Sequence, residues 1–230
     1  MSTLILSITI YWEAYVNVSE PTYCSGLRAT NGARYCGSSS SKQMETVRKE
    51  KKKERLSMSG DMVNEKSSLI TKNLLALKIL DEGTKVAIFA SFQNEPDTEE
   101  LVNYFWAERK ELCLPVTDKG SLRFYEYGSD SVLLKNRFGI SEPDINEAKE
   151  IPIQSLDIIL MPLVVFDQSC NRIGMGSGFY DKALSALDNS KKKTYLIGLA
   201  YEFQKVNQIE PNKWDIPLDY VVTEKKVYHS

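Results

Sequence analysis

The sequence is nearly devoid of histidine. Its 230 residues include a single one, His229, which lies next to the C-terminal residue. Chain ends are usually loosely held, so this residue is poorly placed for chemistry. The scarcity argues against a Ser-His-Asp triad, a Cys-His pair or a metal site built from histidines. Chemistry in this chain must therefore use carboxylates, lysine and arginine, backbone amides, hydroxyls and bound ions.

An excess of charge and a long apolar run are also missing. The formal net charge is -2, which gives no reason to expect nucleic acid or an anionic membrane as a partner. The apolar stretch "LILSITIYW" is far shorter than the roughly 20 residues that span a bilayer, and it lacks the features of a secretory signal. The four cysteines show no metal-ligand spacing, as expected of reduced thiols in a cytoplasmic protein.

The first 41 residues differ in texture from the rest. They contain "CSGLRATNGARYCGSSSS", which is rich in glycine, serine and asparagine and has no usable period. Such a segment buries too little apolar surface to offset its ordering entropy. We predict that residues 1–41 are a disordered leader or are translated from upstream of the true start, with Met44 as a plausible start. A functional tail is the alternative, and residues 42–230 are predicted to form a single domain.

Strands and helices alternate after Ser41. A charged helix is predicted to break at Gly60, where a second helix begins with Ser59 or Asp61 as its cap. The run "LDIILMPLVVFD" is typical of a central strand that is covered on both faces. Further strands are predicted at "KVAIFASF", "ELCLPVT", "SLRFYEY", "KTYLIGLAY" and "DYVVTE". This order predicts an α/β fold, with a layered, mostly parallel sheet and helices on both faces.

The stretch "NRIGMGSGFYDKAL" follows the predicted central strand and leads into a helix. Its glycines at 174, 176 and 178 permit backbone conformations closed to other residues, so amide N–H groups can converge on an anion. The helix start adds free N–H groups, and Arg172 adds a forked donor for phosphate. The spacing matches neither GxxxxGK[ST] nor GxGxxG. A phosphate cradle and a flexible turn both remain open.

Asp181 bears on this choice. A carboxylate beside a phosphate cradle is repulsive unless a cation lies between them, and Mg²⁺ bound by one or two carboxylates and phosphate oxygens meets that need. A first-turn acid that interacts with the helix dipole is the simpler alternative. From the local sequence alone the two explanations are about equal.

Several segments together resemble one known family. "LDIILMPLVVFDQSCNRIGMGSGFYDKAL" is similar to the signature block of the 5-formyltetrahydrofolate cyclo-ligases, also called 5,10-methenyltetrahydrofolate synthetases. In the expected order, "VRKEKKKERLSMS" resembles their basic N-terminal helix, "FASFQNEPDTEELV" their substrate strand and loop, "NRFGISEP" a glycine-containing segment, and "WDIPLDYVVTE" the closing strand. The resemblance extends from about Lys42 to the C-terminus, and nothing in residues 1–41 takes part.

The resemblance implies a fold related to those of sugar-phosphate isomerases and CoA transferases, and a reaction dependent on ATP and Mg²⁺. 5-Formyltetrahydrofolate would be converted into 5,10-methenyltetrahydrofolate, with release of ADP and phosphate through a phosphorylated formyl intermediate. This chemistry requires positioning and charge neutralisation and no histidine base. The expected partners are the folate and MgATP alone, with no nucleic acid or membrane, and the expected state is a monomer.

The resemblance also assigns residues. It implies catalytic roles for Arg172, Tyr180 and Asp181, and Mg²⁺ ligands at Asp181 and Asp215. Nucleotide contacts are implied for Arg48, Arg172, Ile173, Gly174, Met175, Gly176, Ser177, Gly178, Phe179 and Tyr180. Folate contacts are implied for Ala90, Glu95, Phe138, Met175 and Phe179.

Simpler explanations exist for some of these residues. Phe138 would fill core, and Asp215 would form a turn. Arg48, Lys52 and Arg55 share one helix face, which would be a solvated charged face; the resemblance favours Arg48 as an ATP contact, with Arg55 a weaker candidate.

The chain departs from the family pattern at basic positions. Met44 stands where many members have lysine, and Met175 and Ser177 stand where many have a basic residue. The missing charges would be supplied by Lys42, Arg172 or Lys182. A catalytically weak folate- or nucleotide-binding protein on the same fold is therefore the alternative to the enzyme. A sugar-phosphate isomerase or CoA-transferase activity has fold analogy alone in its favour.

Overall fold

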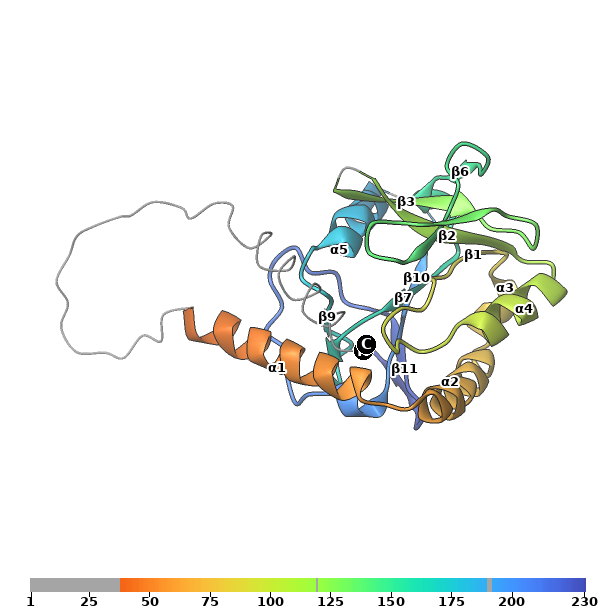
Figure 1. The fold of residues 1–230 in the computed structure, drawn as a ribbon. Coiled ribbons are helices and arrows are strands. Elements are labelled where there is room, and N and C mark those ends of the chain that lie inside the picture. The colour runs from red at the N-terminus through yellow and green to blue at the C-terminus, as the bar shows by residue number, and fades with distance from the viewer. Residues whose placement is uncertain (1–37, 119, 190–191) are drawn as a thin grey trace, which may run out of the picture. The chain divides into compact units, whose positions relative to one another are not determined.

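The computed structural model describes residues 38–118, 120–189 and 192–230 (Figure 1). Most of the predicted leader lies outside these residues, so its disorder stays a prediction. So does the single domain proposed for residues 42–230.

The helices and strands alternate along the described chain. The helices are α1 (Ser38–Leu56), α2 (Gly60–Leu75), α3 (Ile79–Glu82), α4 (Glu99–Ala107) and α5 (Phe179–Leu184), with short 3₁₀ turns at Ile153–Ser155, Ser185–Asn189 and Glu202–Gln204. The strands are β1 (Lys85–Ala87), β2 (Glu111–Asp118), β3 (Ser121–Glu126), β4 (Leu133–Lys135), β5 (Ser141–Pro143), β6 (Glu150–Ile151), β7 (Ile158–Pro162), β8 (Val165–Phe166), β9 (Arg172–Ile173), β10 (Tyr195–Leu199), β11 (Tyr220–Val222) and β12 (Val227–His229). Among the described helices, none is long and apolar enough to cross a membrane.

One eight-stranded sheet organises these elements, in the order β12-β11-β10-β7-β1-β2-β3-β6. The five strands from β11 to β2 are parallel, while β12, β3 and β6 pair antiparallel at the two sides. Two hairpins, β4–β5 and β8–β9, stand apart from it. The prediction of a mostly parallel α/β sheet is confirmed.

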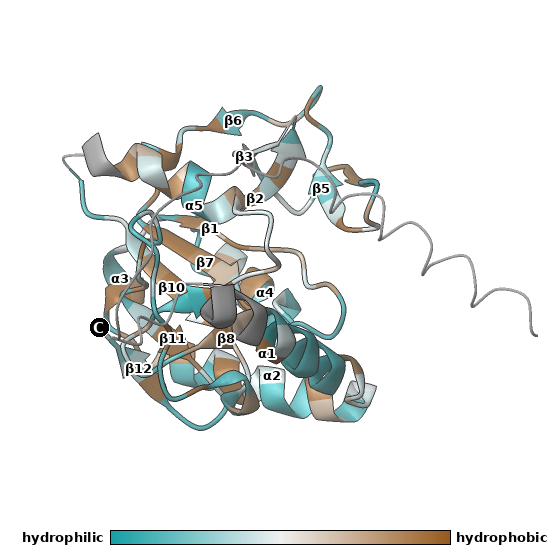
Figure 2. Ribbon diagram, turned by 90° about the vertical axis from the view of Figure 1, so that its left-hand side faces the viewer, coloured by the Kyte–Doolittle hydropathy of each residue, from teal (hydrophilic) through white to brown (hydrophobic). Residues whose placement is uncertain are grey.

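Both faces of the sheet are buried. In β7, Ile158 and Leu160 belong to one apolar cluster, whereas Ile159 and Met161 belong to the other, because successive side chains point to opposite faces. Residues of α2 and α4 cover the first face, and residues of α5 and its following turn cover the second. Figure 2 shows the central strands in brown and α1 largely in teal. Helices therefore cover both faces, as predicted.

The apolar run 156–167 does not form one strand, which corrects the prediction. β7 ends at Pro162, which has no N–H to donate to a neighbouring strand. The buried Gln204 side chain instead donates to the carbonyl oxygens of Leu163 and Val164, at 2.8 and 2.9 Å. The chain leaves the sheet here, and β8 pairs antiparallel with β9. This hairpin brings the glycine loop back toward α1.

The break between the first two helices is confirmed. α2 begins at Gly60, and the side chain of Ser59 accepts a hydrogen bond from the N–H of Met62. Serine satisfies a free donor of the first turn in this way, so a new helix starts instead of a continuation of α1. The chain turns at this break, and the end of α1 packs against the segment that holds Asn94 and Glu95.

At the start of the parallel strands, Asp157 joins β1 to β7. Its Oδ2 accepts hydrogen bonds from the N–H groups of Thr84 and Lys85, both at 2.9 Å, and its Oδ1 lies 2.5 Å from Nζ of Lys192. Partial burial acts to raise the pKa of Asp157, but these donors outweigh it and lower the pKa to about 2, from an ordinary value near 3.8.

We expect Asp157→Asn to lower the free energy of unfolding at pH 7 by about 2 kcal/mol. Because the pKa is depressed in the folded state, the carboxylate stabilises the fold above pH 3.8, and this contribution is lost as the pH falls through about 2. Urea unfolding between pH 7 and pH 2 measures both effects. Asp81→Asn, at an exposed position, is the control. Equal losses in the two variants would contradict the assignment.

Candidate active site

The glycine loop connects β9 to α5 and is exposed from Gly174 to Ser177. Gly176 and Gly178 have φ values of 103° and 63°, in the left-handed region that side chains rarely adopt. The prediction that glycines are needed for the backbone conformation is thus confirmed at these two positions. An exposed backbone of this kind, at the start of a helix, can present N–H groups to an anion.

Asp167 shapes the turn that precedes this loop. It is buried, and its Oδ1 accepts hydrogen bonds from the N–H groups of Ser169 and Asn171, both at 3.0 Å. Its Oδ2 accepts from the Asn171 side chain and from the N–H of Ile209, both at 2.9 Å. Asp167 was not predicted from the sequence as a residue of the site. One signal could have identified it. An aspartate at the end of an apolar run, followed two and four residues later by polar residues, is typical of a turn in which the carboxylate accepts backbone hydrogen bonds.

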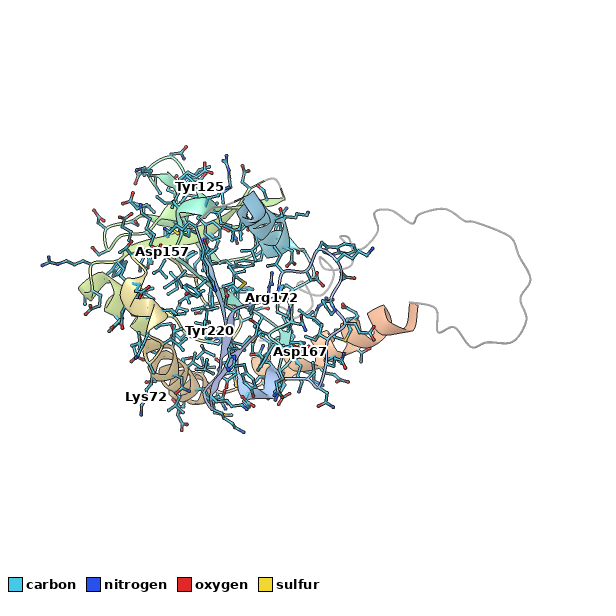
Figure 3. The ribbon with its side chains drawn as sticks, turned by 180° about the vertical axis from the view of Figure 1, so that it is seen from behind. Lys72, Tyr125, Asp157, Asp167, Arg172 and Tyr220 are labelled. Carbon is cyan, nitrogen blue, oxygen red and sulfur yellow. The ribbon has the colours of Figure 1, made fainter. Side chains whose placement is uncertain are left out.

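Arg172 joins three parts of the site. Its side chain is buried, one Nη donates to Oδ1 of Asp181 at 2.5 Å, and the other donates to the carbonyl oxygen of Ile216. Figure 3 shows Arg172 and Asp167 on the side of the molecule where α1 lies. Burial lowers the pKa of Arg172, and the nearby carboxylates of Asp181 and Asp215 oppose that shift. Arg172 thus ties the loop to α5 and to residues 210–217.

Asp181 and Asp215 therefore lie close to one guanidinium. Oδ2 of Asp215 accepts hydrogen bonds from the backbone and side chain of Asn212, at 2.8 and 3.0 Å, so Asp215 does form a turn. Within the described ranges, no group of three or more His, Cys, Asp or Glu side chains could hold a metal. Mg²⁺ that is bound partly by phosphate oxygens needs only one or two carboxylates from the protein.

α1 reaches the glycine loop through Arg48. Its Nε donates to the carbonyl oxygen of Gly174 at 3.0 Å, and its Nη1 pairs with Glu45. A Cβ atom placed on Gly176 would lie 3.7 Å from Nη1 of Arg48, so the guanidinium lies against the loop. Met44, in contrast, packs on an apolar cluster with Val164. Arg48 therefore contacts the loop, and its role as an ATP contact stays a prediction; the side chain of Lys42 lies outside the described residues.

Glu95 lies in the segment that follows β1. It is 8% exposed, and its Oε2 accepts a hydrogen bond from the N–H of Phe92 at 3.2 Å. Its Oε1 lies 3.4 Å from Nη1 of Arg55. Burial raises the pKa of Glu95 to about 7, against the opposing effects of Arg55, the Phe92 N–H and Lys52. The partly buried Ala90 precedes it at the edge of the core.

Tyr180 lies in the first turn of α5, directly after the glycine loop. Its partly buried ring packs against the apolar cluster on the α5 side of the sheet. Burial raises the pKa of its hydroxyl, the charge of Glu95 adds to this shift, and Arg172 opposes it. The charges of both Glu95 and Arg172 therefore affect the pKa of this hydroxyl. No pattern in the sequence predicted this electrostatic link.

Two alternatives from the sequence analysis are wrong. Arg55 is 1% exposed, so the solvated helix face does not include it, and it pairs with Glu95 instead of reaching the loop. Phe138 is 48% exposed between β4 and β5, with the Arg137 guanidinium 4.7 Å from the centre of its ring, so it does not fill core. Met175 is also exposed, and Phe179 is partly buried at the start of α5.

The sheet topology explains why these residues meet. Glu95 follows β1, the glycine loop follows β7, and β10 lies on the other side of β7. The carboxyl ends of parallel strands meet at one edge, where ligands bind in open α/β sheets. This arrangement defines an α/β protein whose candidate site lies at the carboxyl edge of its sheet.

Comparisons with known proteins agree with this arrangement. The model of the 5-formyltetrahydrofolate cyclo-ligase family matches residues 40–224, and the chain belongs to that family. Over 176 residues it is 35% identical to the 5-formyltetrahydrofolate cyclo-ligase of Haemophilus influenzae, covering 75% of this chain and 92% of the relative. Over 146 residues it is 40% identical to the enzyme of the same name from Escherichia coli, covering 62% and 79%.

The fold comparison points the same way. The NMR structure of 5,10-methenyltetrahydrofolate synthetase from Aquifex aeolicus matches with a TM-score of 0.70 and 31% identity. The match covers 80% of this chain and 91% of that structure.

Proposed function

We propose that this chain is a 5-formyltetrahydrofolate cyclo-ligase that consumes ATP. The observation that carries the proposal is the position of α1, which contacts the glycine loop through Arg48 and Glu95 through Arg55. The two residues are seven positions apart, or about 10 Å along a helix axis. A nucleotide phosphate on the loop and a folate ring at Glu95 would therefore be neighbours.

In the proposed reaction, the formyl oxygen attacks the γ-phosphorus of ATP, and ADP leaves. N10 of the folate then attacks the activated formyl carbon, its proton is lost, and phosphate departs as the ring closes. The loop backbone and Arg48 would bind the phosphates, and Glu95 would accept hydrogen bonds from the folate ring, with Ala90, Phe138, Met175 and Phe179 around it. Such a reaction depends on alignment and charge neutralisation.

Asp181 and Asp215 would hold Mg²⁺, which supplies positive charge to the phosphates when it is bound. Arg172 would keep Asp181 and the Ile216 backbone in place. Tyr180 would be held between Arg172 and Glu95. In this proposal Arg48, which lies against Gly174 and Gly176, supplies positive charge to a loop that lacks basic residues at Met175 and Ser177.

The proposed reaction requires no macromolecular partner. We infer that the protein works as a cytoplasmic monomer on its two small-molecule substrates, without nucleic acid or membrane.

An absorbance assay for 5,10-methenyltetrahydrofolate tests the function directly. We expect product from 5-formyltetrahydrofolate only when both ATP and Mg²⁺ are present, with one ADP released for each product. Absence of product at high protein concentration, together with retained folate binding, would overturn the proposal. It would favour a binding protein on the same fold, which the missing loop cations Met175 and Ser177 make the second candidate.

A further inference from the structure

Arg55 is buried without the hydrogen bonds that a buried guanidinium normally makes. Its side chain is 1% exposed, and Nε, Nη1 and Nη2 have no hydrogen-bond partner in the described structure. The nearest carboxylate oxygen, Oε1 of Glu95, lies 3.4 Å from Nη1, as a charge partner. Burying a charge with unused donors costs free energy that such a pair does not fully recover. Stability therefore does not explain why an arginine stands here.

The position of the pair is set by a separate contact. The side chain of Asn94 donates to the carbonyl oxygens of Arg55 and Met58, at 3.1 and 3.0 Å. Asn94 itself has a φ of 57°, a conformation that asparagine tolerates better than most residues. The segment that carries Glu95 is thereby attached to the end of α1. Arg55 and Glu95 are therefore held close to each other by this backbone contact as well as by their opposite charges.

The charged and titratable groups around Glu95 come from two helices. Arg55 and Lys52 of α1 favour its ionised form, and Tyr180 of α5 lies near enough to be affected by its charge. Burial lowers the pKa of Arg55, and the charges of Glu95 and Tyr201 oppose this shift. A cation within about 4 to 6 Å lowers the pKa of a carboxyl by roughly 1 to 3 units. Arg55 is thus the strongest of the side chains that keep Glu95 negative.

We propose that Arg55 is a positioning residue for the folate and not a nucleotide contact: it keeps Glu95 ionised and aimed at the ring N–H donors. This inference rests on the proposed function. The folate's bicyclic ring has adjacent amine and amide N–H groups along one edge, and an ionised carboxylate can accept from both with its two oxygens. A protonated carboxyl has one oxygen that donates, so it matches that edge poorly. Arg55 acts entirely through Glu95, since it is itself shielded from ligand.

The test is the pH dependence of kcat/KM for 5-formyltetrahydrofolate. In the wild type, activity should decline below about pH 7, where Glu95 takes up a proton. In Arg55→Met this decline should move up by at least one pH unit. A two-unit shift would reduce the ionised fraction at pH 7 from about one half to about 1%, a loss of about fiftyfold, regained toward pH 9. Arg55→Lys, which retains the charge, should restore most of the activity at pH 7.

Arg48→Met is the matched control, because it removes the other arginine from the same face of α1. It should raise KM for ATP and leave the pH limb for the folate unchanged, whereas Arg55→Met should change KM for ATP less than twofold. A raised KM for ATP in Arg55→Met, or an unshifted limb, would overturn the inference.

Folate affinity measured by calorimetry without ATP separates this inference from the proposed function. If the wild type binds 5-formyltetrahydrofolate but does not turn it over, the proposed function fails. The pH dependence of the folate affinity still tests the positioning role of Arg55. We expect the affinity of Arg55→Met to recover with rising pH. An affinity that stays low at every pH would overturn the inference. If Arg55→Met does not fold, Arg55→Lys and Arg55→Gln are compared instead. If the decline of activity at low pH does not move in Arg55→Gln, the inference is contradicted.

Discussion

Replacing Asp181 by asparagine is expected to lower kcat by about a thousandfold or more, while the melting temperature falls by only a few degrees. The substitution removes the charge that Mg²⁺ requires of its ligand and changes almost no volume. The amide oxygen can still accept the hydrogen bond that Arg172 donates at 2.5 Å. Measurement of kcat against Mg²⁺ concentration, together with thermal unfolding, checks both parts.

Asp61→Asn is the matched control for this prediction. Asp61 and Asp181 are both acidic residues in the first turn of a helix, so both interact with the helix dipole. Asp61 is exposed at the start of α2, away from the loop. Its substitution should leave kcat unchanged. If Asp181→Asn keeps the wild-type dependence on Mg²⁺, Asp181 is not a metal ligand and the dipole explanation is sufficient.

Replacing Arg172 by methionine is expected to abolish turnover and also to lower the free energy of unfolding, by about 3 kcal/mol. The side chain is 6% exposed, and its loss leaves the partly exposed Asp181 unpaired and the Ile216 carbonyl without its donor. Urea unfolding and the absorbance assay measure the two effects separately.

The double variant Arg172→Met with Asp181→Asn should regain part of the stability and none of the turnover. Arg123→Met is the control, because Arg123 pairs with Glu150 at 3.2 Å where both side chains are nearly half exposed. Surface pairs of this kind contribute about 1 kcal/mol or less. A comparable loss of stability in both arginine variants would show that burial of Arg172 is not the cause. Turnover that survives in Arg172→Met would remove it from the catalytic residues.

Most of the fold was predictable from local patterns. The serine cap at Ser59, the alternating apolar residues of β7 and the order of strands and helices all depend on neighbours in the sequence. The end of β7 was not, because Pro162 acts together with a donor 42 residues later, Gln204. The site was predicted by resemblance at the level of residues, and its chemical roles stay predictions. The contacts that join distant segments, such as Arg48 with Gly174 and Arg55 with Glu95, were beyond reach, because local patterns do not show which segments pack together.

The sequence by itself determined the kind of chemistry and the class of fold. A single histidine in 230 residues left carboxylates, basic residues and backbone amides as the main available groups, and alternating strands and helices required a mostly parallel sheet. Only the tertiary structure decided how three basic residues on one face of α1 are used. Arg48, Lys52 and Arg55 have equivalent sequence surroundings, yet Arg48 meets Gly174 and Arg55 meets Glu95. The physical reason is that helical spacing sets which residues share a face, whereas burial and partners depend on the segments that pack against it.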